Sequence, residues 1–130
     1  MTVELIDPDG LLERPTYSHV AIARGSRIAF ISGQVGFTPD GQLAGEDHFT
    51  QAEQAFRNLA TAVEAVGGSM ENILKITIFV VDNRPQLLEP LMNARAAAFD
   101  EHKPASTYVG VESLARPGLL VEVEAVAVLD

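Results

Sequence analysis

The chain contains no cysteine, so disulfide bonds and thiolate chemistry are excluded. An intracellular setting agrees with this absence. The longest apolar stretches, such as residues 76–81, fall far short of the roughly 20 residues that a membrane span needs. The first residues have neither a basic start nor an apolar run of signal length. We therefore expect a soluble cytoplasmic protein with no membrane partner.

Basic and aromatic residues are also scarce. Lysine and arginine total 9 against 18 acidic residues, which gives a formal net charge of −9, and the chain has only 2 tyrosines and 6 phenylalanines. The basic residues are scattered along the chain, and no stretch interleaves them with aromatic residues. Such a charge repels nucleic acids and anionic membranes, so we expect no nucleic-acid partner.

Apolar residues, in contrast, are plentiful enough for a folded core. The chain has 130 residues, of which 47% are hydrophobic and 21% are charged. This length and composition are typical of one globular domain, and we expect residues 1–130 to form it. Residues 1–14 are expected to be an N-terminal arm with a turn at residues 7–10, where the sequence reads Asp-Pro-Asp-Gly.

The pattern of apolar residues predicts the order β-β-α-β-α-β-β. Residues 20–24 and 28–32, joined by Gly25-Ser26, are predicted to form a hairpin. Apolar residues at spacings of three and four predict a helix over 49–66, and a second helix is expected from about 88 to 102 with Pro90 in its first turn. The remaining strands are predicted at 73–82, 106–111 and 120–129. This order indicates an α+β sheet with both helices on one face.

The last predicted strand has two apolar faces. Val121, Val123 and Ala125 point one way, toward the helices, whereas Glu122 and the valines that follow it at alternate positions point the other way. A sheet face that meets water is usually more polar, so this second face is expected to be buried by other subunits. The alternative, a few exposed valines without meaning, stays open.

The assembled pattern resembles the RidA/YjgF family, the reactive-intermediate deaminases, also known as endoribonuclease L-PSP. The resemblance runs from about residue 14 to residue 129. It is carried, in order, by "RPTYSHVAI", "AFISGQVGFTPDGQL", "QAEQAFRNLATAVEAVGGSMENILKITIFVVD", "LMNARAAAF" and "PGLLVEVEAVAVL". The resemblance implies a chorismate-mutase-like fold. It also implies a homotrimer whose sheets form a central barrel, with a small-molecule pocket at each subunit junction.

Deaminases of this family hydrolyse 2-imino and 2-enamino acids to keto acids and ammonia, without a metal or cofactor. Matching the motifs to this chain implies that Glu122 positions the attacking water and that Tyr17 borders the pocket. The match further implies that Ser32 and Gly33 form the turn at the pocket floor, and that Asn93 is a polar residue of the second helix near the ligand.

The chain departs from the family at one position. The family pattern is Pro-Ala-Arg-Ser, where arginine holds the substrate carboxylate, but residues 104–107 read Pro-Ala-Ser-Thr. A bidentate, charge-assisted contact exceeds a neutral hydrogen bond by about 1–2 kcal/mol or more. We therefore expect weak or no activity on 2-aminoacrylate. Ser106 and Thr107 are candidate contacts for a neutral polar ligand, or else ordinary strand residues.

Each of the other assigned residues also has an alternative, purely structural interpretation. Glu122 is a catalytic acid or a strand acid in a solvated trimer channel. Tyr17 stacks on a ligand or caps the predicted hairpin, and Asn93 bonds a ligand or the neighbouring backbone. The three histidines, His19, His48 and His102, lack metal-ligand spacing, so no metal site is predicted. Two functions remain: an imine or enamine hydrolase with an atypical substrate, and a non-catalytic trimer that binds a metabolite.

Overall fold

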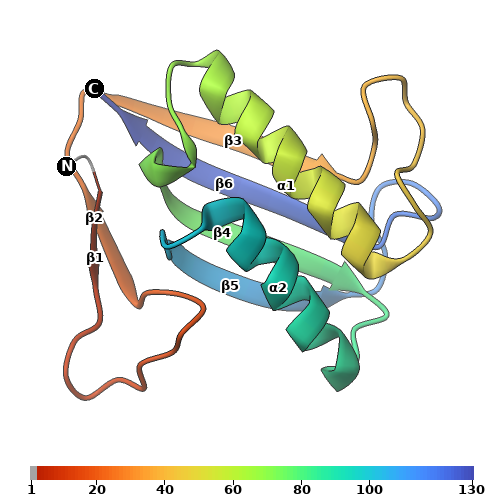
Figure 1. Cartoon of the computed structure of the whole chain (residues 1–130), viewed down its shortest axis with the longest axis horizontal. Helices are drawn as coiled ribbons and strands as arrows, with labels where there is room; N and C mark the ends of the chain where they lie inside the picture. The colour runs from red at the N-terminus through yellow and green to blue at the C-terminus, as the bar shows by residue number, and fades with distance from the viewer. Residues whose placement is uncertain (1–2) are drawn as a thin grey trace.

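The computed structural model describes residues 3–130 and contains a four-stranded sheet with two helices on one face (Figure 1). The strand order is β3-β6-β4-β5, and a separate two-stranded sheet pairs β1 with β2. The strands are β1 (Val3–Ile6), β2 (Val20–Ala23), β3 (Arg27–Val35), β4 (Ile73–Val81), β5 (Ala105–Val111) and β6 (Val121–Leu129). The helical segments are α1 (His48–Ala65), η1 (Met70–Asn72), η2 (Pro85–Leu87) and α2 (Leu88–Phe99). The α+β class is confirmed.

The predicted hairpin between residues 20–24 and 28–32 is wrong. β2 pairs with β1, a strand inside the segment expected to be only an arm, while β3 pairs antiparallel with β6. A Cβ at Gly25 would come within 2.5 Å of the Leu129 carbonyl oxygen, so only glycine allows the backbones to approach here. The Gly25-Ser26 turn therefore leads the chain from the small sheet into the main sheet.

The first helix begins at a polar cap and continues as an apolar stripe, as predicted. The Asp47 carboxylate accepts a hydrogen bond from the backbone N–H of Thr50 at 2.9 Å, which satisfies one of the free donors of the first turn. Helix α1 ends at Ala65, and Gly67 follows with φ 91°, the left-handed conformation that glycine adopts readily at helix ends.

The second helix connects β4 to β5, which run parallel. Parallel neighbours need a crossover of this kind. Pro90 lies in the first turn of α2, as predicted, where its missing N–H costs no helical hydrogen bond. The helix ends at Phe99 rather than near residue 102, because Asp100 has φ 55°. No helix within residues 3–130 is long and apolar enough to cross a membrane.

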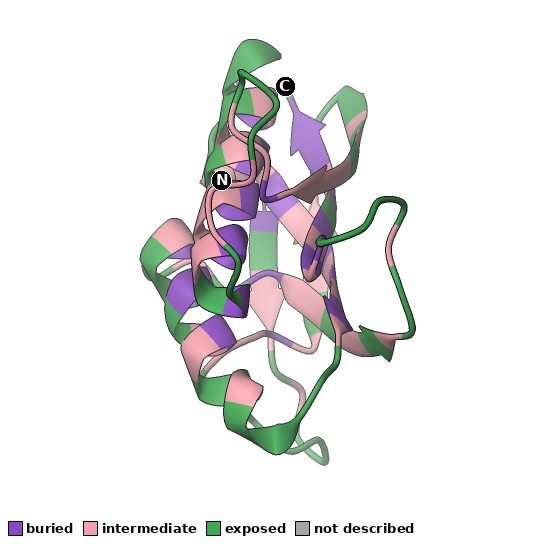
Figure 2. Cartoon of the chain, turned by 90° about the vertical axis from the view of Figure 1, so that its right-hand side faces the viewer, coloured by how far each residue is buried: buried purple, intermediate pink, exposed green. Residues whose placement is uncertain are grey.

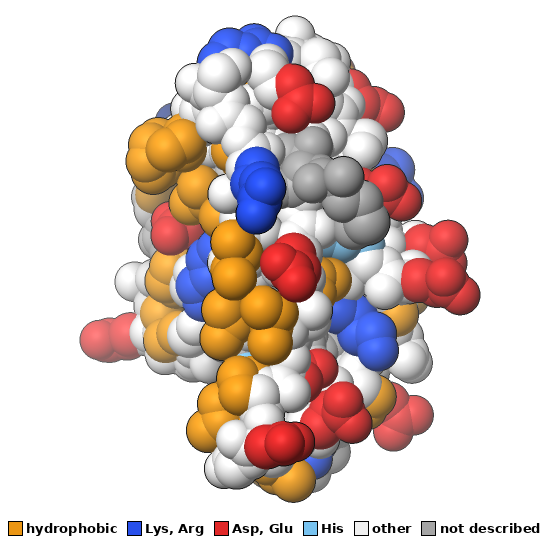
Figure 3. All heavy atoms as spheres, turned by 90° about the vertical axis from the view of Figure 1, so that its left-hand side faces the viewer, with side chains coloured by type: hydrophobic (Ala, Val, Ile, Leu, Met, Phe, Trp, Pro, Cys, Tyr) orange, Lys and Arg blue, Asp and Glu red, His pale blue; other side chains and the backbone are white. Residues whose placement is uncertain are grey.

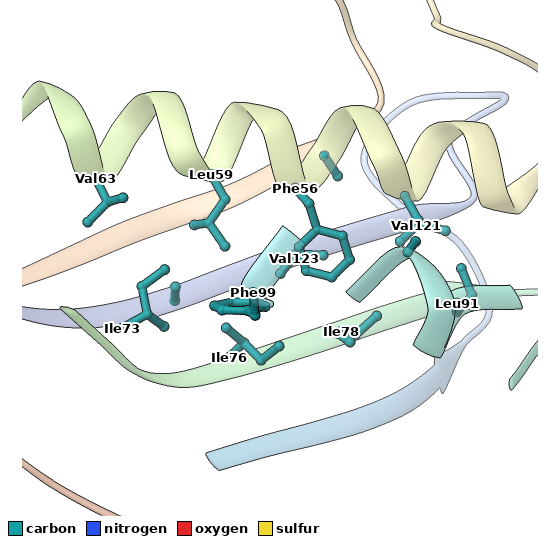
Figure 4. Close-up of a cluster of buried hydrophobic side chains, with 14 of the residues drawn as sticks. Phe56, Leu59, Val63, Ile73, Ile76, Ile78, Leu91, Phe99, Val121 and Val123 are labelled. Atoms are coloured by element: carbon teal, nitrogen blue, oxygen red, sulfur yellow. The ribbon is translucent and has the colours of Figure 1, made fainter. Parts of the chain in front are cut away.

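The core lies between the two helices and the sheet. Figure 2 shows the buried residues gathered there, with exposed residues on the outer surfaces of the helices. Figure 4 shows Phe56 and Leu59 of α1 pointing toward Ile76 and Ile78 of β4, with Phe99 of α2 among them. The Phe56 and Phe99 rings meet edge to face with centroids 5.9 Å apart.

In the described part of the chain, both helices lie on one face of the main sheet and none covers the opposite face (Figure 1). Phe30 of β3 is 81% exposed and Ile28 is 65% exposed, and they are paired with Val126 and Val128 of β6. We call this surface the open face. Hydrophobic side chains also lie among acidic and basic ones on the side of the molecule that carries β1 and β2 (Figure 3). A large exposed phenylalanine on a flat sheet is typical of a surface that another chain covers.

Candidate functional site

The segment before β2 runs beside β5 and brings Tyr17 close to Ser106. Ser18 forms a parallel bridge with Ala105, and its backbone N–H donates to the Pro104 carbonyl at 3.5 Å. Ser18 is buried by this contact. Two predicted site residues that are far apart in sequence, Tyr17 and Ser106, therefore line one cavity.

This cavity has a volume of about 310 Å³ and is bounded by the segment before β2, helix α2 and strand β5. Its lining consists of Arg14, Thr16, Tyr17, Leu88, Met92, Arg95, Ser106 and Tyr108. The Tyr108 hydroxyl donates to Asn83 at 2.7 Å, and burial raises the pKa of this phenol. Two arginines and no carboxylate line the cavity, so the serine at position 106 has not left it without positive charge.

Arg95 lines this cavity and is not among the residues predicted from the sequence. Its side chain is 2% exposed, although it belongs to the most polar residue type. Its Nη2 atom donates to the Pro104 carbonyl at 3.2 Å, and its guanidinium carbon lies 5.7 Å from the centre of the Phe99 ring. Burial lowers the pKa of Arg95 to about 10, so the group is still a cation at neutral pH. The available signal was an arginine at helical spacing with Leu88, Met92 and Phe99.

Glu122 lies on the open face, directly over the backbone of Gly33. The pairing of β3 with β6 is irregular between Ile31 and Gln34, which places the Ser32-Gly33 step at a bulge. A Cβ at Gly33 would overlap the Glu122 carboxylate. Glycine at this position therefore makes room for the acid, and Glu122 and Gly33 lie side by side.

Thr107 lies apart from Ser106, although the motif places them side by side. Neighbouring residues of a strand point to opposite faces, and Ser106 points toward α2 while Thr107 lies on the open face. There the Lys75 ammonium donates a hydrogen bond to the Thr107 hydroxyl. Desolvation lowers the pKa of Lys75, and the nearby Glu124 carboxylate opposes this shift.

Asn93 is exposed on α2 and does not line the cavity that Tyr17 and Ser106 share. Ser32 is also exposed, and its carbonyl accepts a hydrogen bond from the Gln34 side chain at 3.1 Å. One chain therefore distributes the predicted residues over separate places. Tyr17 and Ser106 lie on the helix side of the sheet, Glu122, Gly33 and Thr107 lie on the open face, and Asn93 lies on a helix surface.

The histidine rings bond backbone carbonyls. His19 Nε2 lies 2.6 Å from the Leu12 oxygen, His48 Nε2 lies 2.7 Å from the Val81 oxygen, and His102 Nε2 lies 2.7 Å from the Ile73 oxygen. Within residues 3–130 no three histidine, aspartate or glutamate side chains gather as a metal site would require. His19 also meets the edge of the Tyr17 ring, with centroids 5.4 Å apart, so it supports the wall of the cavity.

A larger cavity of about 740 Å³ lies at the C-terminal end of β4, beside residues 82–84. It is lined by Glu46, Asp47, His48, Asp82, Asn83, Arg84 and Leu120. Asp47 is already occupied as the cap of α1, and the His48 ring is bonded to Val81. Three acids line this cavity beside one arginine, so its charge is opposite to that of the Tyr17–Ser106 cavity.

Comparison with known proteins shows extensive similarity. The family model described as endoribonuclease L-PSP matches residues 11–129. Protein HMF1 of Saccharomyces cerevisiae is 32% identical over 112 residues, which cover 86% of this chain and 83% of HMF1. The mouse 2-iminobutanoate/2-iminopropanoate deaminase is 34% identical over 103 residues, which cover 78% of this chain and 74% of the deaminase. The crystal structure of YyfB from Yersinia pestis, a Rid-family protein of unknown function, has a TM-score of 0.95 at 28% identity and covers 99% of this chain and 100% of YyfB.

Proposed function

The chain belongs to the endoribonuclease L-PSP family, also known as the RidA/YjgF family, and on that premise we propose that it is a homotrimer that hydrolyses a small imine or enamine in pockets between its subunits. Residues 1–130 act as one domain in this proposal. The observation that carries it is the Glu122 carboxylate, which faces away from the helices over the backbone of Gly33. The deaminase named among the relatives makes this reaction class the leading candidate.

Assembly is supported by the composition of the open face. Phe30 and Ile28 are largely exposed in one chain, and burying such side chains contributes about 1.5–3 kcal/mol each. Assembly would also bring the two parts of the site together, because Glu122 and the cavity at Ser106 lie on opposite faces of the sheet within one chain. A complete site therefore takes Glu122 from one subunit and the Tyr17–Ser106 cavity from another.

In this proposal Glu122 accepts a hydrogen bond from water and orients it toward the carbon of the C=N bond. The water oxygen bonds to that carbon as Glu122 takes one of the water protons, and the C=N electron pair moves to nitrogen, which receives that proton from Glu122. The tetrahedral centre then collapses: its hydroxyl proton passes by way of Glu122 to the nitrogen, a C=O group forms, the C–N bond breaks, and ammonia leaves. An oriented base or acid of this kind contributes typically about 10²- to 10⁴-fold to rate.

2-Aminoacrylate is expected to be a poor substrate. Ser106 presents a short neutral hydroxyl where deaminases of the family have an arginine, so it does not fix a carboxylate in two places. Substrate orientation is lost along with the charge, and small misplacements of a reacting carbon are costly. Turnover of larger imines is expected to exceed turnover of 2-aminoacrylate.

The proposal is tested by generating 2-imino acids in situ with an amino-acid oxidase and trapping them with semicarbazide. The protein is expected to reduce the trapped imine, and Glu122→Gln is expected to lose this activity by about 10²-fold or more. Glu124→Gln, a neighbouring acid on the same strand and face, is the matched control and should keep it. Full activity of Glu122→Gln, or a monomer by sedimentation velocity, contradicts the proposal.

A non-catalytic metabolite-binding trimer is the second candidate. It is favoured by Ser106 itself, since binding needs the cavity but not the arginine that orients substrate in the deaminases. Under this alternative the wild-type protein binds a keto acid but leaves every imine in the trapping assay untouched. The two candidates therefore differ in turnover and agree in binding.

A further inference from the structure

Arg95 is buried without a full set of partners. Of its nitrogen atoms, Nη2 bonds the Pro104 carbonyl, whereas Nε is buried and has no hydrogen-bond partner within residues 3–130. A guanidinium offers five donors, and a buried donor left without an acceptor costs about 1–3 kcal/mol. The pKa of Arg95 is shifted by desolvation alone, with no contribution from an acid in the described part of the chain. No acid within residues 3–130 therefore neutralises the cation.

Arg95 lies at the wall of the cavity of about 310 Å³ described above. Ser106 has a much smaller side chain than the arginine of the family pattern, and the space beside it lies between β5 and α2. Arg95 reaches this space from α2, and Tyr17 closes it from the segment before β2. Arg14 adds a second cation to the lining. In a protein with a formal net charge of −9, a cavity with two cations and no acid is suited to an anion.

We propose that Arg95, from helix α2, binds the carboxylate of the substrate in the cavity that Tyr17 and Ser106 line. The guanidinium donates a charge-assisted hydrogen bond to the carboxylate, and the Ser106 hydroxyl donates a further hydrogen bond. This inference rests on the proposed function, since it takes the Tyr17–Ser106 cavity to be the substrate pocket. It assigns the substrate class as small organic acids rather than neutral imines.

The position of this cation explains why carboxylate binding and poor turnover of 2-aminoacrylate are compatible. Arg95 is tied to Pro104 at the start of β5 and lies against the Phe99 ring, so its guanidinium is fixed on the helix side of the strand. A carboxylate bound there lies deeper than one bound by an arginine on β5. The C=N carbon of the shortest imino acid is then displaced from Glu122 of the neighbouring subunit.

Methionine methyl NMR tests the inference without requiring turnover. Met92 lines the Arg95 cavity, and Met70 lies in the groove between α1 and α2, so the two methyl groups report separately. Titration with 2-oxobutanoate is expected to shift the Met92 signal and leave Met70 in place. The neutral isostere 2-oxobutanamide is expected to bind at least tenfold more weakly, because it lacks the charge that Arg95 recognises.

Variants identify which arginine is responsible. Arg95→Gln keeps a donor for the Pro104 carbonyl and is expected to weaken 2-oxobutanoate at least tenfold, while Arg95→Lys recovers part of the affinity. Arg57→Gln, an exposed arginine on α1 beside Met70, is the matched control and should bind as the wild type does. Folding of each variant is read from the dispersion of the same methyl spectra.

Two results overturn the inference: equal affinity for the acid and its amide in the wild type, or wild-type affinity for 2-oxobutanoate in folded Arg95→Gln. The first comparison needs no variant, so it decides the matter even where Arg95→Gln fails to fold. Binding of 2-oxobutanoate and turnover in the semicarbazide assay are measured on the same wild-type protein. Failure of the proposed hydrolysis is therefore seen as binding without turnover, and failure of the Arg95 assignment as turnover without dependence on Arg95.

Discussion

The two faces of the main sheet differ in what covers them. The helix-covered face is closed by α1 and α2, and its side chains, such as Ile76 and Val123, are fully buried. The open face carries exposed Phe30 and, further along β6, acids such as Glu122. The covered face is complete within one chain and explains why the chain folds. In the proposed function the open face supplies Glu122 and is covered by other chains, so that proposal divides folding and function between the two sides of the same strands.

The largest expected effects come from replacing a phenylalanine with alanine on each of the two faces. Phe56→Ala removes a buried ring from the covered face, and we expect it to lower the free energy of unfolding by about 3–5 kcal/mol. Phe30→Ala removes an exposed ring from the open face. It is expected to leave the secondary structure intact and to shift the protein toward lower mass on dilution.

Urea unfolding and sedimentation velocity over a range of concentrations measure these two effects. If Phe30→Ala leaves the mass distribution unchanged at every concentration, the open face is not the assembly surface. If Phe56→Ala is as stable as the wild type, the core described between α1 and the sheet is wrong.

A smaller substitution on the open face, at Gly33, tests whether the position of the Glu122 carboxylate matters for the reaction. Gly33→Ala introduces a Cβ that would overlap the Glu122 carboxylate, so the acid must turn away. The φ angle of Gly33 lies outside the left-handed range, and alanine therefore brings no backbone strain of its own. Imine hydrolysis is expected to fall at least tenfold in the semicarbazide assay, with little change in the urea midpoint.

Ser32→Ala is the matched control for Gly33→Ala, because Ser32 is exposed and its carbonyl, not its hydroxyl, is the group that bonds Gln34. It should retain activity. Unchanged turnover in Gly33→Ala, together with unchanged stability, would show that the position of the Glu122 carboxylate does not matter for the reaction.

The helices and the family could be predicted from the sequence, because their signals are local or ordered along the chain. The stripe of α1 needs only spacings of three and four, and the Pro90 position follows from one missing N–H. The hairpin prediction failed because strand pairing depends on distant residues. The turn at Gly25 looks like a hairpin, but β3 finds its partner in β6, at the far end of the chain.

The candidate site could be predicted only in part for a similar reason. The resemblance named Glu122, Gly33, Tyr17 and Ser106 as site residues, and in the structure Glu122 lies beside Gly33 while Tyr17 and Ser106 line one cavity. It grouped Thr107 with Ser106 because a motif is written along the chain, whereas a strand sends adjacent residues to opposite faces. Arg95 was missed because the resemblance assigns no role to it, although it lies within the segment 91–99 that carries the resemblance. The role proposed for Arg95 depends on the burial of its side chain, and the positions of the basic residues along the sequence do not show which of them is buried.

The smallest expected effect comes from a substitution at Asp47, which lies on neither face of the sheet, and it provides a reference for the larger changes in the free energy of unfolding. Asp47 caps α1 through the backbone N–H and the hydroxyl of Thr50, at 2.9 and 3.1 Å. Asp47→Ala is expected to lower the free energy of unfolding by about 1 kcal/mol at pH 7 and to leave assembly and turnover unchanged. Urea midpoints of the variant and the wild type measure this difference.

The same cap predicts a dependence on pH with a definite sign. The backbone N–H and hydroxyl of Thr50 hold the pKa of the Asp47 carboxyl below its ordinary value of about 3.9 in the folded state. The charge therefore contributes stability that is complete above the unfolded pKa and is lost as the pH falls through the folded one. The gap between wild type and Asp47→Ala should narrow below about pH 4. Asp47→Asn, a neutral cap, should show no such narrowing relative to Asp47→Ala, and a gap that widens in acid would contradict the assignment of Asp47 as a charged cap.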